Sequence, residues 1–144
     1  MSDFQADQQV LLSELARSRS VLTEVLGGLV RDDLSVARPG SWAISRILDH
    51  VLQSERLYTQ LISVFSSKPA TVQDTAPVTS PDEAITALDS SRRSFLDAVS
   101  QVQEGDFYRL QTVGHDEYSV LSILENNAAH DREHAEQIRR TVSR

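Results

Sequence analysis

Apolar residues recur at helical spacing in four stretches of the chain, and polar residues occupy the opposite faces. The stretches are Asp7–Val30, Ser41–Phe65, Ser80–Gly105 and Ser119–Val142. In each of them an apolar residue returns every three or four positions, which is typical of an amphipathic helix with one buried face. The pattern therefore predicts an all-α protein with four long helices.

Local start signals support three of these helices. Ser41 follows a proline and a glycine, and Ser119 directly precedes the last apolar stretch. The clearest signal is at Ser80, where a cap residue is followed by Pro81 and then by Glu83 three positions on. Serine at the cap, proline at the first helical position and glutamate at the third are the preferred chemistry of a helix start. We expect helices to begin at these serines.

Two connections break the helical pattern. Ser66–Thr79 is long and rich in Ser, Thr, Pro and Ala, and Asp106–Tyr118 is irregular, with room for a short extended piece before Gly114. Neither segment contains a convincing strand. Four amphipathic helices in a chain of 144 residues predict a single helical domain over residues 1–144. The fold we expect is a four-helix bundle with a long crossover connection between helices 2 and 3.

Composition and charge narrow the classes of partner. The formal net charge is -7, from 14 basic and 21 acidic residues, which argues against nucleic acid as a partner. No apolar run approaches the roughly 20 residues that span a bilayer, so we expect no membrane insertion. The N-terminal residues lack the pattern of a signal peptide, which predicts a cytoplasmic protein. Cysteine is absent, so any metal ion must be held by imidazole, carboxylate, carbonyl or water.

Three of the four histidines are candidates for a shared metal site. His130 and His134 are four residues apart on the predicted fourth helix, so their side chains lie one turn apart on one face. His50 lies on the predicted second helix, beside its apolar face. Three protein ligands with an open coordination position are the pattern of catalytic zinc sites. Imidazole suits several divalent ions, of which zinc and nickel are our leading choices.

A less specific interpretation remains open for each of these residues. A histidine on an apolar helix face is often a core residue that is hydrogen-bonded to a neighbour, and a pair at four-residue spacing also arises by chance. His115 is expected to be a solvated turn residue. No residue can be named as catalytic or as cofactor-binding.

Four nearby side chains have open roles. Asn127 and Ser54 share faces with the histidines, and either orient a ligand or make ordinary hydrogen bonds in the core. Glu133 is expected on the surface. Trp42 either roofs a pocket or, as we favour, anchors the start of the second helix in the core.

The same residues resemble a known family. The motifs that carry the resemblance are Arg38-Pro39-Gly40-Ser41-Trp42, Ile47-Leu48-Asp49-His50, Ser54-Glu55, Tyr118-Ser119-Val120 and His130-x-x-x-His134-x-x-Gln137-Ile138. Together they are similar to the second and fourth helices of the DinB/YfiT-like superfamily, and the likeness in length and helix layout covers essentially the whole chain.

This resemblance implies a fold, a site and an activity. The expected fold is again a four-helix bundle with a long second connection. A divalent metal ion would be held by His50, His130 and His134. Members of known activity are thiol-dependent transferases, which use mycothiol or bacillithiol, and a related isomerase. The resemblance thus implies a metal-dependent enzyme that activates a thiol or water, as an S-transferase or a hydrolase. A low-molecular-weight thiol, a small-molecule substrate and a homodimer are the implied partners.

Other classes are weighed against this hypothesis. The main alternative is a non-catalytic bundle that binds a small molecule or dimerises. A ferritin-like di-iron protein is unsupported, because it needs Glu-x-x-His motifs on two helices and the nearest pattern here is Asp131-x-x-His134. A Ser-His-Asp hydrolase is unsupported as well, because no nucleophile-elbow motif is present.

Overall fold

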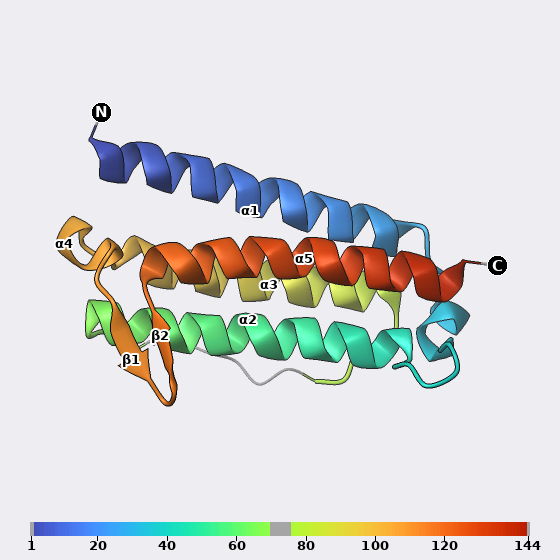
Figure 1. Cartoon of the computed structure of the whole chain (residues 1–144). Helices are drawn as coiled ribbons and strands as arrows, with labels where there is room; N and C mark the ends of the chain where they lie inside the picture. The colour runs from blue at the N-terminus through green and yellow to red at the C-terminus, as the bar shows by residue number, and fades with distance from the viewer. Residues whose placement is uncertain (1, 70–75, 144) are drawn as a thin grey trace.

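Four long helices lie side by side in the structure, a computed structural model that describes residues 2–69 and 76–143 (Figure 1). They are α1 (Asp3–Gly27), α2 (Ile44–Ser66), α3 (Pro81–Ser100) and α5 (Val120–Val142). The shorter elements are η1 (Arg31–Ser35), α4 (Glu104–Phe107), β1 (Gln111–Val113) and β2 (Asp116–Tyr118). This arrangement confirms the predicted four-helix bundle.

The helix directions show the crossover. In Figure 1, α1 and α5 run in one direction, and α2 and α3 run in the opposite one. Helix α3 therefore starts at the end of the bundle where α2 starts, as a crossover between them requires. Residues 70–75 of this predicted connection lie outside the described residues. Helix α5 packs most extensively against α1 and also against α2, while α2 packs on α3. None of the helices within the described residues has the length and apolarity needed to cross a membrane.

Two of the three predicted serine caps are confirmed. The Ser80 hydroxyl accepts a hydrogen bond from the Glu83 backbone N–H at 3.1 Å, and Ser119 caps α5 in the same way. The prediction for Ser41 is wrong, because Ala43 is the N-cap of α2. The chain first folds back on itself there, since the Ile44 N–H donates to the Val36 carbonyl at 3.1 Å. The second helix therefore begins two residues later than the motif suggests, which is about half a turn.

Two other helix ends differ from the prediction, because the apolar pattern does not mark them. Helix α1 begins at Asp3 rather than at Asp7, because Ser2 and Gln5 form a reciprocal capping box ahead of the first apolar residues. Helix α3 ends at Ser100 rather than at Gly105, and Gly105 belongs to the separate one-turn helix α4.

The segment before α5 contains a small β-hairpin that the sequence did not predict as strands. Strands β1 and β2 pair in antiparallel fashion, with Val113 opposite Asp116. The turn between them is two residues long, and Gly114 has a φ of 67°, which a glycine adopts without steric cost. Three-residue strands are too short for alternation to stand out in a sequence.

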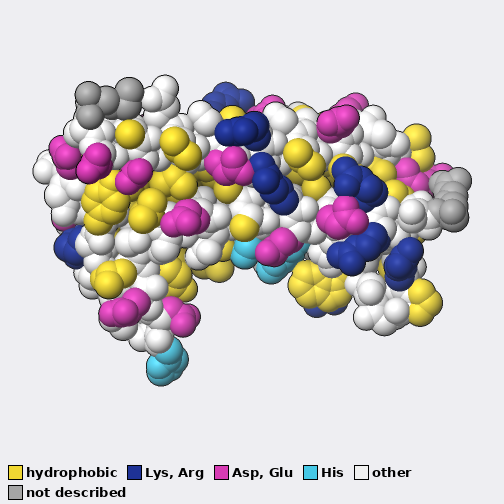
Figure 2. Space-filling view, turned by 45° about the horizontal axis from the view of Figure 1, so that its top comes forward, with side chains coloured by type: hydrophobic (Ala, Val, Ile, Leu, Met, Phe, Trp, Pro, Cys, Tyr) yellow, Lys and Arg dark blue, Asp and Glu magenta, His cyan; other side chains and the backbone are white. Residues whose placement is uncertain are grey.

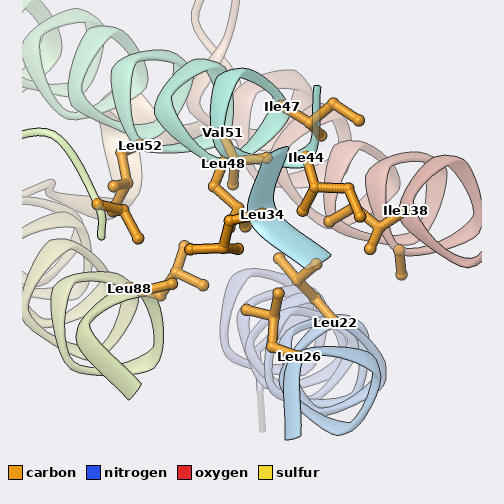
Figure 3. Close-up of a cluster of buried hydrophobic side chains, with 13 residues drawn as sticks. Leu22, Leu26, Leu34, Ile44, Ile47, Leu48, Val51, Leu52, Leu88 and Ile138 are labelled. Atoms are coloured by element: carbon orange, nitrogen blue, oxygen red, sulfur yellow. The ribbon is translucent and has the colours of Figure 1, made fainter. Parts of the chain in front are cut away.

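The apolar core is divided into two clusters. The first lies at the end of the bundle that η1 covers, where leucine, isoleucine and valine side chains from the long helices meet (Figure 3). Its labelled members are Leu22, Leu26, Leu34, Ile44, Ile47, Leu48, Val51, Leu52, Leu88 and Ile138. The second cluster contains the phenylalanines Phe65, Phe95 and Phe107. Charged side chains from all four long helices are buried as well.

We call these charged side chains the ionic layer: Arg19 of α1, Glu55 of α2, Arg92 of α3 and Asp131 of α5. Their exposed fractions are 6%, 1%, 8% and 1%. Both arginines donate to one oxygen of Glu55, at 2.9 and 2.8 Å, and to Asp131 Oδ2, at 2.9 and 2.8 Å. Two positive and two negative charges thus neutralise one another inside the bundle.

The ionic layer also bonds to the backbone and to the side-chain amide of Asn127. Arg19 Nη1 donates to the Leu88 carbonyl at 2.9 Å, and Arg92 Nη1 donates to the Leu15 carbonyl at 3.0 Å. Burial raises the pKa of the Glu55 carboxyl, but the two arginines outweigh it and hold that pKa below its ordinary value. Because each long helix contributes one member that bonds to the other helices, the layer fixes the rotation of each helix about its axis and its position along that axis.

Candidate metal centre

The three predicted ligands meet on the side of the bundle where α2 and α5 face each other. His50 comes from the first half of α2, and His130 and His134 come from successive turns of α5. The ring centroids of His50 and His134 are 5.1 Å apart, and those of His130 and His134 are 5.8 Å apart. Side chains 80 residues apart in sequence thus form one histidine cluster, a name kept below for these three residues.

The ring separations fit a shared ion. Two imidazoles on one tetrahedral zinc, each with a Zn–N bond of about 2.0–2.1 Å, have centroids roughly 5 Å apart. The rings stand edge to face, with interplanar angles of 78° and 82°. No group of three or more His, Cys, Asp or Glu side chains in residues 2–69 and 76–143 has its ligand atoms already gathered for an ion. Rotation of the rings about χ2, which is a soft torsion in histidine, would have to complete the arrangement.

The histidine cluster is half-buried, and the surroundings of His50 favour its neutral form. Burial lowers the pKa of His50, and the nearby His134 and His130 lower it further. Neutral imidazole is the form that binds metal ions. Figure 2 shows histidine side chains at a concave part of the surface, next to hydrophobic and acidic side chains. A small molecule in solvent can therefore reach the cluster.

Gln137 orients one of the rings. His134 Nδ1 lies 3.0 Å from the Gln137 side-chain oxygen, which can only accept, so Nδ1 carries the hydrogen. This leaves the lone pair of Nε2 for a metal ion. A hydrogen bond from the second ring nitrogen is the usual way in which a protein fixes the tautomer of a ligand histidine.

Tyr58 contacts another ring, and sequence reasoning missed it. Its hydroxyl oxygen lies 3.2 Å from His130 Nδ1 and 3.3 Å from His130 Nε2. Tyr58 follows His50 by eight residues, so the two side chains lie about two turns apart on one side of α2. That spacing was the available signal. Burial raises the pKa of the Tyr58 phenol, and Tyr118 and Glu133 add to the effect.

Trp42 also lies at the cluster, on the surface. Its ring centroid is 5.3 Å from that of His50, and the Arg46 guanidinium lies 4.4 Å from the centre of the indole ring. The side chain is 36% exposed. The role that we favoured from the sequence, an anchor in the core, is therefore wrong, and Trp42 flanks His50 instead.

The remaining candidates are placed as follows. Asn127 donates to Glu55 at 3.0 Å, so it makes an ordinary buried hydrogen bond next to the ionic layer. Glu133 is exposed, as predicted, and His115 is exposed in the hairpin turn, also as predicted. Ser54 is half-buried on the same side of α2 as His50.

Comparisons with known proteins agree with this architecture. The sequence model of the DinB superfamily matches residues 14–138. Among solved structures, a four-helix bundle protein named TT2238 is similar, with 20% identity, a TM-score of 0.70, and coverage of 92% of this chain and 98% of that chain. A conserved protein from Enterococcus faecalis is similar with 13% identity, a TM-score of 0.63, and coverage of 98% and 95%. At these identities the two structures show a shared fold only. No curated protein matches the chain.

Proposed function

The chain belongs to the DinB superfamily, and from this membership and the geometry of the histidine cluster we propose that it binds a divalent metal ion. His50, His130 and His134 are the proposed ligands. The observation that carries the proposal is the approach of three imidazole rings from two helices, with centroids 5.1 Å apart for His50 and His134 and 5.8 Å apart for His130 and His134. Imidazole suits several divalent ions, and zinc and nickel are the ones that we propose.

We further propose that the protein is a metal-dependent enzyme of the S-transferase or hydrolase type. Three protein ligands leave coordination positions open, and an ion held there would supply the Lewis acidity that deprotonates a thiol or water near neutral pH. The chain itself supplies access and orientation. Because the cluster is only half-buried, a small-molecule substrate and a low-molecular-weight thiol could reach it from solvent. Gln137 holds the His134 ring in one tautomer.

Elemental analysis of protein purified without an affinity tag tests the metal site. We expect His134→Ala to lose most of the bound metal, while its helix content by circular dichroism stays close to that of the wild type. His115→Ala is the matched control, because this histidine is exposed in the hairpin turn, and it should keep its metal. Equal metal content in the wild type and His134→Ala would contradict the proposal.

A further inference from the structure

Tyr58 is a half-buried tyrosine whose hydroxyl faces the histidine cluster. We propose that this hydroxyl donates a hydrogen bond to a small thiolate bound at the open position beside the three histidines, and does not serve to orient His130. The inference rests on the proposed metal site, and it names a side chain of the protein that would contact the bound thiolate directly.

The geometry at His130 argues against an orienting role. The Tyr58 oxygen is almost equally far from the two ring nitrogens, at 3.2 and 3.3 Å. These nitrogens flank one carbon, so an oxygen at equal distance from both lies in line with neither lone pair. Hydrogen bonds weaken steeply when they are misaligned. By contrast, Gln137 approaches a single nitrogen of His134, which is the arrangement that fixes a ring.

Among the side chains that hydrogen-bond to the three rings, Tyr58 supplies the donor. The Arg46 guanidinium is stacked on the Trp42 indole, 4.4 Å from the ring centre. The Gln137 contact to the cluster is made by an oxygen, which accepts. The Asn127 amide donates to Glu55 in the core. Among the described polar contacts to the three histidines, the Tyr58 O–H is the one that can donate to an anion. Trp42 lies against His50 through its ring.

A bound thiolate would benefit from such a donor. Hydrogen bonds to a charged partner are shorter and stronger than neutral ones. Loss of one typically weakens binding roughly 10- to 100-fold. The Tyr58 residue is half-buried, so solvent competes for its hydroxyl less than at an open surface.

Cobalt-loaded protein and 2-mercaptoethanol provide the test. The absorption band of a cobalt–thiolate contact reports thiol affinity, and competition with a chelator reports cobalt affinity. We expect Tyr58→Phe to weaken 2-mercaptoethanol binding roughly 10- to 100-fold and to leave cobalt affinity unchanged. Tyr118→Phe is the matched control, because Tyr118 is a half-buried tyrosine near Tyr58, and it should change neither affinity.

The outcomes separate this inference from the proposed function. Unchanged thiol affinity in Tyr58→Phe overturns the inference and leaves the metal site standing. A drop in cobalt affinity shows that Tyr58 supports His130 as a ligand and likewise overturns the inference. A wild-type protein that takes up no cobalt overturns both.

Discussion

Helix α5 contributes side chains to two polar clusters that differ in burial and in how far their members bond to one another. Asp131 points into the bundle and belongs to the ionic layer, where four charged side chains are at most 8% exposed and bond to one another. His130 and His134 flank it in sequence and lie at the half-buried surface toward α2. The charged side chains of one cluster are enclosed by their own partners, and the side chains of the other are half-exposed to solvent.

The difference separates architecture from chemistry. A buried ion pair contributes little net stability over apolar residues, but it is costly to break because the abandoned charge stays buried. Such a group specifies how helices align. The histidine cluster has few internal partners, so it can accept an ion or a ligand at small cost to the fold. Partial exposure, rather than polarity alone, distinguishes the cluster for which we propose a function.

The largest effect should follow from breaking the ionic layer. Asp131→Ala removes the acceptor shared by Arg19 and Arg92 and leaves each guanidinium group without one of its two carboxylate partners. We expect the free energy of unfolding to fall by about 3–5 kcal/mol in urea titrations.

The control for this loss is an exposed acid on the same helix. Glu136 pairs with Arg139 at the surface, and Glu136→Ala should cost at most about 1 kcal/mol. His134→Ala should also leave most of the stability in place. If Asp131→Ala unfolds at the same urea concentration as the wild type, the structural role assigned to the layer is wrong.

A smaller effect is expected at the histidine cluster, where Gln137 contacts His134. Gln137→Leu removes the acceptor that fixes the His134 tautomer, and metal affinity should fall roughly 10- to 100-fold while stability changes little. Competition with a chromophoric chelator measures the affinity. Gln9→Leu, at an exposed position of α1, is the control. Unaltered affinity in Gln137→Leu would mean that the ring is oriented in some other way.

The smallest effect concerns pH. The folded-state pKa of Glu55 lies below its ordinary value of 4.5, because Arg19 and Arg92 overcome the effect of burial. The unfolded chain therefore binds more protons as the solution is acidified. This contribution to stability is fully present above pH 4.5 and is lost as the pH falls through the folded pKa. In urea titrations from pH 6 to pH 3, the free energy of unfolding should fall less steeply with pH for Glu55→Gln than for the wild type. Equal slopes would show that Glu55 is not the origin of the pH dependence.

The helices and the approach of the three histidines were predictable from the sequence, for different reasons. Apolar periodicity located the long helices, and local cap chemistry located Ser80 and Ser119 correctly. The pairing of His130 with His134 follows from helical spacing alone. The approach of His50 came from the family resemblance, since no local pattern states which faces of two distant helices meet.

The ionic layer was missed although its signal is present. Arg19 lies between Leu15 and Leu22 at the spacing of the buried stripe of α1, and Arg92 lies between Leu88 and Phe95 in α3. One charged residue in an apolar stripe can equally be a boundary residue whose head reaches solvent. Only the register between helices, which depends on all of their packing together, shows that the charges meet.

The interleaving of two roles along five residues of α5 has a consequence for how this segment can vary. An α-helix turns by about 100° per residue, so one inserted or deleted residue between His130 and His134 would rotate one set of side chains away from the other. Asp131 could then not face the arginines while both imidazoles face α2. Exchanges of the exposed Glu133 would keep both sets of side chains in place, but a change in the length of this segment would disturb the ionic layer and the proposed ligand pair together.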